Sequence, residues 1–191
     1  VSRPKTPHLP KANSYPLLAL MASVLQPNSG KVIIDGRVAP LLALSAGFHA
    51  DLTGRENIVL RGVLLGLTRK SILKKIDEII EFSEIEDSIA QPIRTYSSGM
   101  LARLGFALVA CLDPDILIID EILAVGDKDF RKKCFNKIME FKKSGVTIVF
   151  VSHDTESVVN LCQRAIWIKN HQIHMDGPAD TVVSAYEAIP E

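Results

Sequence analysis

The spacing of apolar residues divides the chain into a helical stretch and a later part that alternates strands with helices. Residues 55–112 are predicted to be wholly helical, and the clearest helix spans 69–82, with Thr68 placed to cap its start. One apolar stripe along that helix consists of Ile72, Leu73, Ile76, Ile79 and Ile80. Residues 116–119 and 146–151 are short unbroken runs of branched apolar residues, a pattern typical of strands buried on both faces of a sheet.

The two apolar runs are joined by a segment with helical spacing, which predicts how they pair. Phe130, Cys134, Ile138 and Phe141 recur along one face of a helix over 130–143. A strand, a helix and a strand in succession predict a parallel, right-handed βαβ unit. The other expected elements are helices at 17–25, 155–161 and 178–186, strands at 31–34 and 38–44, a loop at 45–54, and a hairpin of 165–169 and 172–175 around Asn170 and His171. The predicted fold class is therefore α/β with a helical insertion.

Composition narrows the class of protein further. The chain has 191 residues, of which 47% are hydrophobic, and these values predict one domain of ordinary size rather than a disordered chain. Its 22 basic and 22 acidic residues balance, which disfavours nucleic-acid binding through a general basic field. The longest apolar stretches, 16–25 and 104–112, are shorter than the roughly twenty residues that cross a bilayer. Three widely spaced cysteines favour a reduced intracellular protein over a disulfide scaffold.

Acidic residues and a histidine follow the two predicted strands, at the sheet edge where α/β proteins usually bind ligands. Asp120 and Glu121 come directly after 116–119. Asp120 is a candidate to hold Mg²⁺ through water and Glu121 to polarise an attacking water, with a simple cap of the next helix as the alternative for Asp120. His153 follows 146–151 and is a candidate to contact a γ-phosphate, with a structural histidine as the alternative.

Two serines and a glycine open the apolar helix that runs up to residue 112. Ser97, Ser98 and Gly99 are expected to present N–H groups and the positive end of the helix dipole, which suit a phosphate. An ordinary serine cap explains the same residues. Both interpretations stay open here, because each needs only a serine at a helix start.

The order of these features is more informative than any one of them. A serine-glycine helix start, a strand ending in Asp-Glu and a strand followed by Ser-His-Asp succeed one another, and this arrangement resembles the nucleotide-binding domain of the ABC transporters. The resemblance makes 96–100 the signature motif, 116–120 the Walker B strand, 124–127 the D-loop, Glu121 the catalytic glutamate and His153 the switch histidine. It implies a P-loop NTPase-like parallel sheet core over 17–191, with an all-helical signature subdomain at about 54–112.

The variant forms of the motifs are similar to one subgroup of that family, the ATP-binding subunits of polysaccharide, O-antigen and teichoic-acid exporters. The matching stretches are Tyr-Ser-Ser-Gly-Met at 96–100 and the segments 46–49, 52–57, 123–127, 164–167 and 175–178. This resemblance implies ATP and Mg²⁺ as cofactors and a head-to-tail homo- or heterodimer of ATP-binding subunits. It also implies separate transmembrane permease subunits, no nucleic-acid partner, and a peripheral location at the cytoplasmic face of the membrane.

The first sixteen residues depart from the family pattern, which requires a P-loop of the form GxxGxGK[ST]. Counted back from the turn at 27–30, the P-loop lysine falls on Ser14 and the Mg²⁺ ligand on Tyr15. No glycine precedes Gly30, and Pro4, Pro7, Pro10 and Pro16 lie in this stretch. We therefore expect residues 1–16 to be an irregular proline-rich segment in place of the P-loop, with a degenerate Walker A and without the strands that precede it in the family.

Four interpretations of function remain after this departure. The chain can be an exporter ATPase subunit whose own site is impaired, which leaves open whether it hydrolyses ATP, or a catalytically silent partner that lends Ser97, Ser98 and Gly99 to an intact subunit. It can also be a non-functional remnant left by truncation or a frameshift. The ABC-type DNA-repair ATPases share the main motifs, but the exporter-like segment 52–57 and the absence of coiled-coil heptads disfavour that class.

Overall fold

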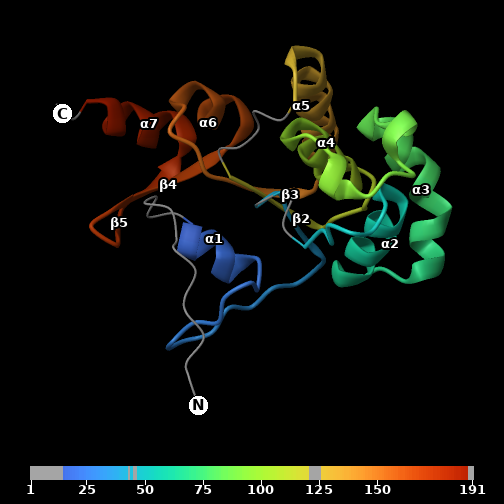
Figure 1. Cartoon of the computed structure of the whole chain (residues 1–191). Coiled ribbons are helices and arrows are strands. Elements are labelled where there is room, and N and C mark those ends of the chain that lie inside the picture. The colour runs from blue at the N-terminus through green and yellow to red at the C-terminus, as the bar shows by residue number, and fades with distance from the viewer. Residues whose placement is uncertain (1–14, 43, 45–46, 121–125, 189–191) are drawn as a thin grey trace.

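The computed structural model describes residues 15–42, 44, 47–120 and 126–188, and Figure 1 shows how their helices and strands are arranged. The elements, in chain order, are α1 (Tyr15–Met21), β1 (Val38–Pro40), α2 (Gly54–Leu64), α3 (Arg69–Ser83), α4 (Ser98–Ala110), β2 (Ile116–Ile119), α5 (Lys128–Lys143), β3 (Thr147–Phe150), α6 (Thr155–Leu161), β4 (Arg164–Lys169), β5 (Gln172–Pro178) and α7 (Ala179–Glu187). The predicted α/β class is confirmed. No helix in the described part of the chain is long and apolar enough to cross a membrane.

A three-stranded parallel sheet forms the centre of the fold, in the order β1-β2-β3. The central strand β2 buries Leu117, Ile118 and Ile119 almost completely. β3 pairs with β2 alone among the described strands, and its residues are only partly buried. The expectation that 146–151 is buried on both faces is therefore wrong, because a strand with one paired neighbour keeps an open edge.

Helices cover the two faces of this sheet, since successive side chains of a strand point to opposite sides. On one face, Leu18 of α1 packs with Ile118. On the other, Leu117 and Ile119 pack against α5 (Figure 1). The residues that α5 buries there are Phe130, Cys134, Ile138 and Phe141, as their spacing predicts. The parallel pairing of β2 and β3 across α5 confirms the expected parallel strand–helix–strand arrangement.

Helices α2, α3 and α4 pack around a second apolar core at one end of the molecule (Figure 1). Thr68 caps α3 as predicted, since its hydroxyl accepts a hydrogen bond from the Ser71 N–H at 3.2 Å. The apolar stripe of α3 is confirmed at its four isoleucines, but Leu73 is 48% exposed because it lies off the face that contacts α2 and α4. The assignment of 54–112 to a separate subdomain stays a prediction.

The segment between β1 and α2 is held by two polar side chains of α2 that are themselves buried. Asn57 accepts a hydrogen bond from the His49 N–H at 2.7 Å and donates to the carbonyls of His49, Leu52 and Thr53 at 3.0–3.1 Å. Arg61 donates to the Leu44 carbonyl and lies 4.7 Å from the centre of the Phe48 ring. These contacts fix the path of the chain from the sheet to the helices.

The C-terminal hairpin also follows the sequence. β4 and β5 are antiparallel, and the turn residues Asn170 and His171 have φ angles of 51° and 62°, which asparagine tolerates better than most residues. Trp167 joins the hairpin to α7, because its ring contacts His174 at 4.3 Å and Tyr186 at 5.5 Å between centroids.

Four predicted elements differ from the structure. No strand forms at 31–34, where Ile33 is 78% exposed and no described strand pairs with it, and a lone strand is not stable without a neighbour. The strand expected at 38–44 is limited to Val38–Pro40, and the first helix spans Tyr15–Met21 rather than 17–25. The stretch 55–112 is interrupted between α3 and α4 by two single turns of 3₁₀ helix, Glu86–Ser88 and Ile93–Thr95.

Candidate functional site

Asp120 and His153 lie at the same edge of the sheet, where the parallel strands β2 and β3 end. Ile119 is opposite Phe150 in the strand register, and the Val151 N–H donates to the Ile119 carbonyl at 3.0 Å beyond the last paired residues. Asp120 is half-buried and His153 is exposed. The structure therefore brings together two of the predicted site residues, while their chemical roles stay predictions.

Several predicted residues lie outside the described part of the chain. These are Glu121, the assigned catalytic glutamate, Ser14 of the degenerate Walker A, and the first two D-loop residues, Ala124 and Val125. Tyr15 begins α1, but its side chain is not among those described. Their assignments stay predictions, as does the expectation of an irregular segment at 1–16.

Ser97, Ser98 and Gly99 lie at an open hollow at the start of α4. Ser97 is the N-cap, and its hydroxyl accepts a hydrogen bond from the Met100 N–H at 3.2 Å. The hollow has a volume of about 560 Å³ and is lined by Ser97, Ser98, Gly99, Met100, Ala102, Arg103, Gly126 and Asp127. The serine cap is therefore confirmed, and Ser98 and Gly99 beside it also line an open hollow that could take a phosphate. We call this feature the signature hollow.

The N–H groups of the first two residues of α4 have no hydrogen-bond partner among the described residues. The Met100 N–H is bonded to the Ser97 hydroxyl and the Leu101 N–H to the Ser97 carbonyl, which leaves those of Ser98 and Gly99. A side chain added at Gly99 would meet only the Ser97 Oγ, at 3.7 Å, so close packing does not require this glycine. Its small size instead keeps the helix start accessible, and an accessible helix start favours an anion.

A network of charged side chains forms the wall of the signature hollow. Arg103 of α4 donates to Glu84 at 2.7 Å and to Asp127 at 2.5 Å, and its guanidinium lies 4.6 Å from the centre of the Phe130 ring. A backbone hydrogen bond from Phe130, and then that from Arg103, hold the pKa of Asp127 below its ordinary value. Glu84 also has a lowered pKa, chiefly through its hydrogen bond from Lys133.

Sequence reasoning missed Arg103, although a signal for it exists. Arg103 is the one charged residue in the apolar stretch 101–112. A charged residue in such a stretch indicates a specific partner, because burial without one is costly. The partners themselves lie in other segments, so the sequence does not reveal them.

The signature hollow and the edge of the sheet are separate places. Neither Asp120 nor His153 is among the described residues that line the hollow. The hollow therefore groups Ser98 and Gly99 with Arg103 and Asp127 rather than with these two residues.

The residues at the sheet edge fit Mg²⁺ only if waters and phosphate oxygens of a substrate supply most of its ligands. No group of three or more histidine, cysteine, aspartate or glutamate side chains among the described residues is arranged to hold a metal. Mg²⁺ usually keeps several waters and binds one or two carboxylates together with phosphate oxygens of a substrate. The carboxylate of Asp120 satisfies that limited requirement.

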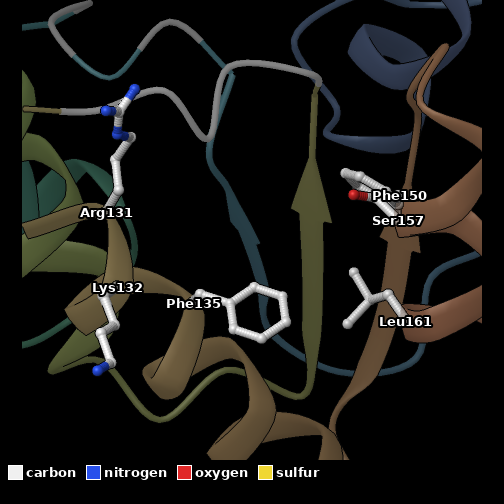
Figure 2. Close-up of a pocket in the computed structure, with 6 residues that line it drawn as sticks. All are labelled: Arg131, Lys132, Phe135, Phe150, Ser157 and Leu161. Carbon is white, nitrogen blue, oxygen red and sulfur yellow. The ribbon is translucent and has the colours of Figure 1, made fainter. Parts of the chain in front are cut away.

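A second hollow of about 350 Å³ lies between α5, β3 and α6 (Figure 2). Figure 2 shows Phe135 pointing into it, with Phe150 and Leu161 across from the ring, while the charged ends of Arg131 and Lys132 extend away from that ring. Its lining contains none of the predicted site residues. It is a mainly apolar gap between two helices and β3, and we assign no chemistry to it.

The chain is similar in sequence to ATP-binding proteins of export systems. It is 52% identical over 170 residues to the O-antigen export system ATP-binding protein RfbB of Klebsiella pneumoniae, covering 89% of this chain and 69% of the relative. It is 49% identical to RfbB of Myxococcus xanthus and 47% identical to the teichoic acids export ATP-binding protein TagH of Bacillus cereus, covering 91% and 88% of this chain. It spans only 40% and 31% of the length of those two relatives. No family model matches the chain.

Solved structures agree in fold. The ATP-binding subunit of an ABC transporter matches with a TM-score of 0.78 at 17% identity, covering 94% of this chain and 79% of the other. A dimeric ATP-binding cassette bound to ADP and Pi matches with a TM-score of 0.70 at 18% identity, covering 87% and 80%.

Proposed function

The chain belongs to the ABC-transporter nucleotide-binding domains of the polysaccharide-exporter subgroup, and on this premise we propose that it lends its signature hollow to ATP held by a second ATP-binding subunit. The resemblance read from the motifs is thereby confirmed for the family and the fold. In the proposal, the pair couples ATP binding and hydrolysis to export of a polysaccharide of the O-antigen, capsule or teichoic-acid type. Separate permease subunits form the path through the membrane, and the chain lies at its cytoplasmic face.

The single observation that carries the proposal is the open, donor-rich start of α4. The N–H groups of Ser98 and Gly99 have no partner among the described residues, and the hollow beside them has room for a phosphate. Charge that develops on a phosphoryl group is stabilised by donors that are already in position, and one such contact is commonly worth about 3 kcal/mol. The hollow can therefore contribute to hydrolysis.

In the proposal a second subunit holds the nucleotide, because the described lining of the hollow does not include the residues proposed to bind Mg²⁺ and to contact the γ-phosphate. Asp120 and His153, the proposed Mg²⁺-binding and phosphate-sensing residues, are not part of its lining in the described structure. A head-to-tail pair places the hollow of one subunit against the corresponding edge of the other. Asp120 retains the carboxylate that an Mg²⁺ site on this chain needs. The proposal leaves that site without the P-loop lysine and hydroxyl that would act beside it, because Ser14 and Tyr15 stand at those positions.

We propose further that the chain by itself binds ATP weakly. Ser14 stands where the P-loop lysine is expected and Tyr15 where the Mg²⁺ ligand is expected, and no glycine precedes Gly30. Without these groups, the nest of N–H donors and the lysine charge that hold the phosphates are missing.

The test mixes the purified chain with a full-length exporter subunit that has an intact P-loop and an inactivated signature. We expect the chain to restore ATP hydrolysis and Ser98→Glu to abolish that effect, since a carboxylate in the hollow repels phosphate. Glutamate at a helix start is stabilising, so this variant should fold. Ser71→Glu, at the start of α3, is the matched control and should restore hydrolysis like the unmodified chain.

Two results contradict the proposal. Failure of the unmodified chain to restore hydrolysis at any ratio refutes the lending of the hollow. Tight binding of labelled ATP with Mg²⁺ by the chain alone refutes the assignment of Ser14 and Tyr15 as a degenerate Walker A.

A further inference from the structure

We propose that Arg103 is a positioning residue that holds the signature hollow in a fixed relation to α3 and α5, so that hydrolysis of the second subunit's ATP depends on it. The inference rests on the proposed function and deepens it. It concerns a residue that contacts neither nucleotide nor Mg²⁺ in that proposal.

Arg103 bridges two carboxylates that come from different parts of the chain. Glu84 ends α3 in the left-handed conformation, with φ of 55°, and Asp127 caps the start of α5. The Arg103 guanidinium donates to both, and only 17% of its side chain is exposed. One side chain on the helix that forms the hollow thus joins the ends of two other helices.

Each carboxylate also accepts a hydrogen bond from α5, so its position depends on where that helix lies. Asp127 accepts hydrogen bonds from the N–H groups of Asp129 and Phe130 at 3.1 and 2.9 Å, so its side chain sets the start of α5. Glu84 accepts from Lys133 of α5 at 2.8 Å. Displacement of α3 or α5 therefore acts on Arg103, and through Arg103 on the wall of the hollow.

The geometry requires arginine rather than any cation. The planar guanidinium has several donors directed apart, which reach two carboxylates while one face covers the Phe130 ring. A lysine at this position carries one ammonium group on a flexible stem, so we expect it to hold one carboxylate firmly and the other loosely. Arg103→Lys keeps the positive charge but weakens the bridge between the two carboxylates, so this variant shows which of the two matters.

The experiment uses the mixed pair described above and compares Arg103→Met, Arg103→Lys and a matched control, Lys75→Met. Lys75 is a part-buried cation that also joins two segments, through Asp113 at 2.7 Å and the Cys111 carbonyl at 2.8 Å, but it lies away from the hollow. The maximal hydrolysis rate at saturating chain and ATP is measured together with the thermal midpoint of each variant.

We expect Arg103→Met to lower the maximal rate at least tenfold, roughly the effect of a small misplacement of a group in a reactive site, and Arg103→Lys to recover part of it. Lys75→Met should lower the thermal midpoint and leave the rate within about twofold, since it perturbs no residue at the hollow. Equal losses of rate in Lys75→Met and Arg103→Met, or an unchanged rate in Arg103→Met, overturn the inference.

Amide hydrogen exchange of the chain alone tests the inference independently of the proposed function. Exchange at the Met100 and Phe130 amides should quicken by about fivefold or more in Arg103→Met and Arg103→Lys, and not in Lys75→Met. Failure of the unmodified chain to restore hydrolysis, combined with this exchange pattern, contradicts the proposed function and leaves the positioning of the hollow supported. Unchanged exchange at both amides overturns the inference.

Discussion

Replacement of Gly105 by alanine should destabilise the protein, although the same change in most helices is stabilising. Gly105 lies in the middle of α4 and faces the Leu44 carbonyl group. A methyl group there would lie 2.9 Å from the carbonyl carbon and closer still to the oxygen, which is tighter than side-chain contacts in proteins allow. Backbone atoms, rather than a flexible side chain, must therefore move.

The magnitude follows from three opposing contributions. Overpacking of a tight core costs about 2 kcal/mol, and alanine gains about 1 kcal/mol over glycine in helix propensity. Displacement of Leu44 also weakens the hydrogen bond that its carbonyl accepts from the buried Arg61, which is worth about 2 kcal/mol for a charged donor. We therefore expect the free energy of unfolding to fall by about 3 kcal/mol.

Urea denaturation followed by circular dichroism measures this change, and Gly99→Ala on the same helix is the matched control. A methyl group at Gly99 meets only the Ser97 Oγ at 3.7 Å, so this variant should be unchanged or up to about 1 kcal/mol more stable. With a urea slope of about 2 kcal/mol per molar, the two midpoints should differ by more than 1 M. Equal stability of the two variants would refute the packing argument, because it would mean that Leu44 does not constrain α4.

Three further changes test other parts of the structure. Asn57→Ala should lower the free energy of unfolding by about 3 kcal/mol, measured in urea, because four backbone contacts lose a fully buried partner; a loss below 1 kcal/mol counts against this role. Thr53→Ala removes the capping box with Glu56 and should cost about 1 kcal/mol by the same measurement, and no loss would contradict it. Glu84→Gln should lower the urea concentration at the unfolding midpoint at pH 7. The pKa of Glu84 is lowered in the folded protein, so its carboxylate stabilises the fold above its ordinary pKa of 4.5, and this stabilisation declines as the pH falls from there through the lowered pKa; a difference from the unmodified chain that does not shrink between pH 7 and pH 3 would argue against the ion pairs.

Local sequence patterns predicted those parts of the fold that depend on neighbouring residues. The cap at Thr68, the four buried isoleucines of α3 and the turn at Asn170 and His171 each require only residues within a few positions. The buried face of α5 was likewise predicted from the spacing of Phe130 and its partners. Helical and hairpin periodicities determine such features before any distant segment is in place.

Elements that depend on pairing were predicted less well. The apolar residues of 31–34 match a strand pattern, yet Ile33 is exposed because no described strand lies beside it. The composition of 146–151 is that of a central strand, while β3 is paired on one side only in the described sheet. Whether an apolar run is central, at an edge or unpaired depends on other segments, which the run does not encode.

For the candidate site, too, some features follow from local sequence and others only from tertiary structure. The motifs at Ser97–Gly99, Asp120 and His153 identify the family from sequence alone, since they depend on residue types in a fixed order. The tertiary structure added the bridge from Arg103 to Glu84 and Asp127, and the separation of the hollow from the sheet edge. These facts join residues that are far apart in the chain, and their proximity arises only when α3, α4 and α5 pack together. The sequence by itself thus determined the family to which the chain belongs and which residues are candidates for its chemistry, and the packing of its helices decided where those residues lie.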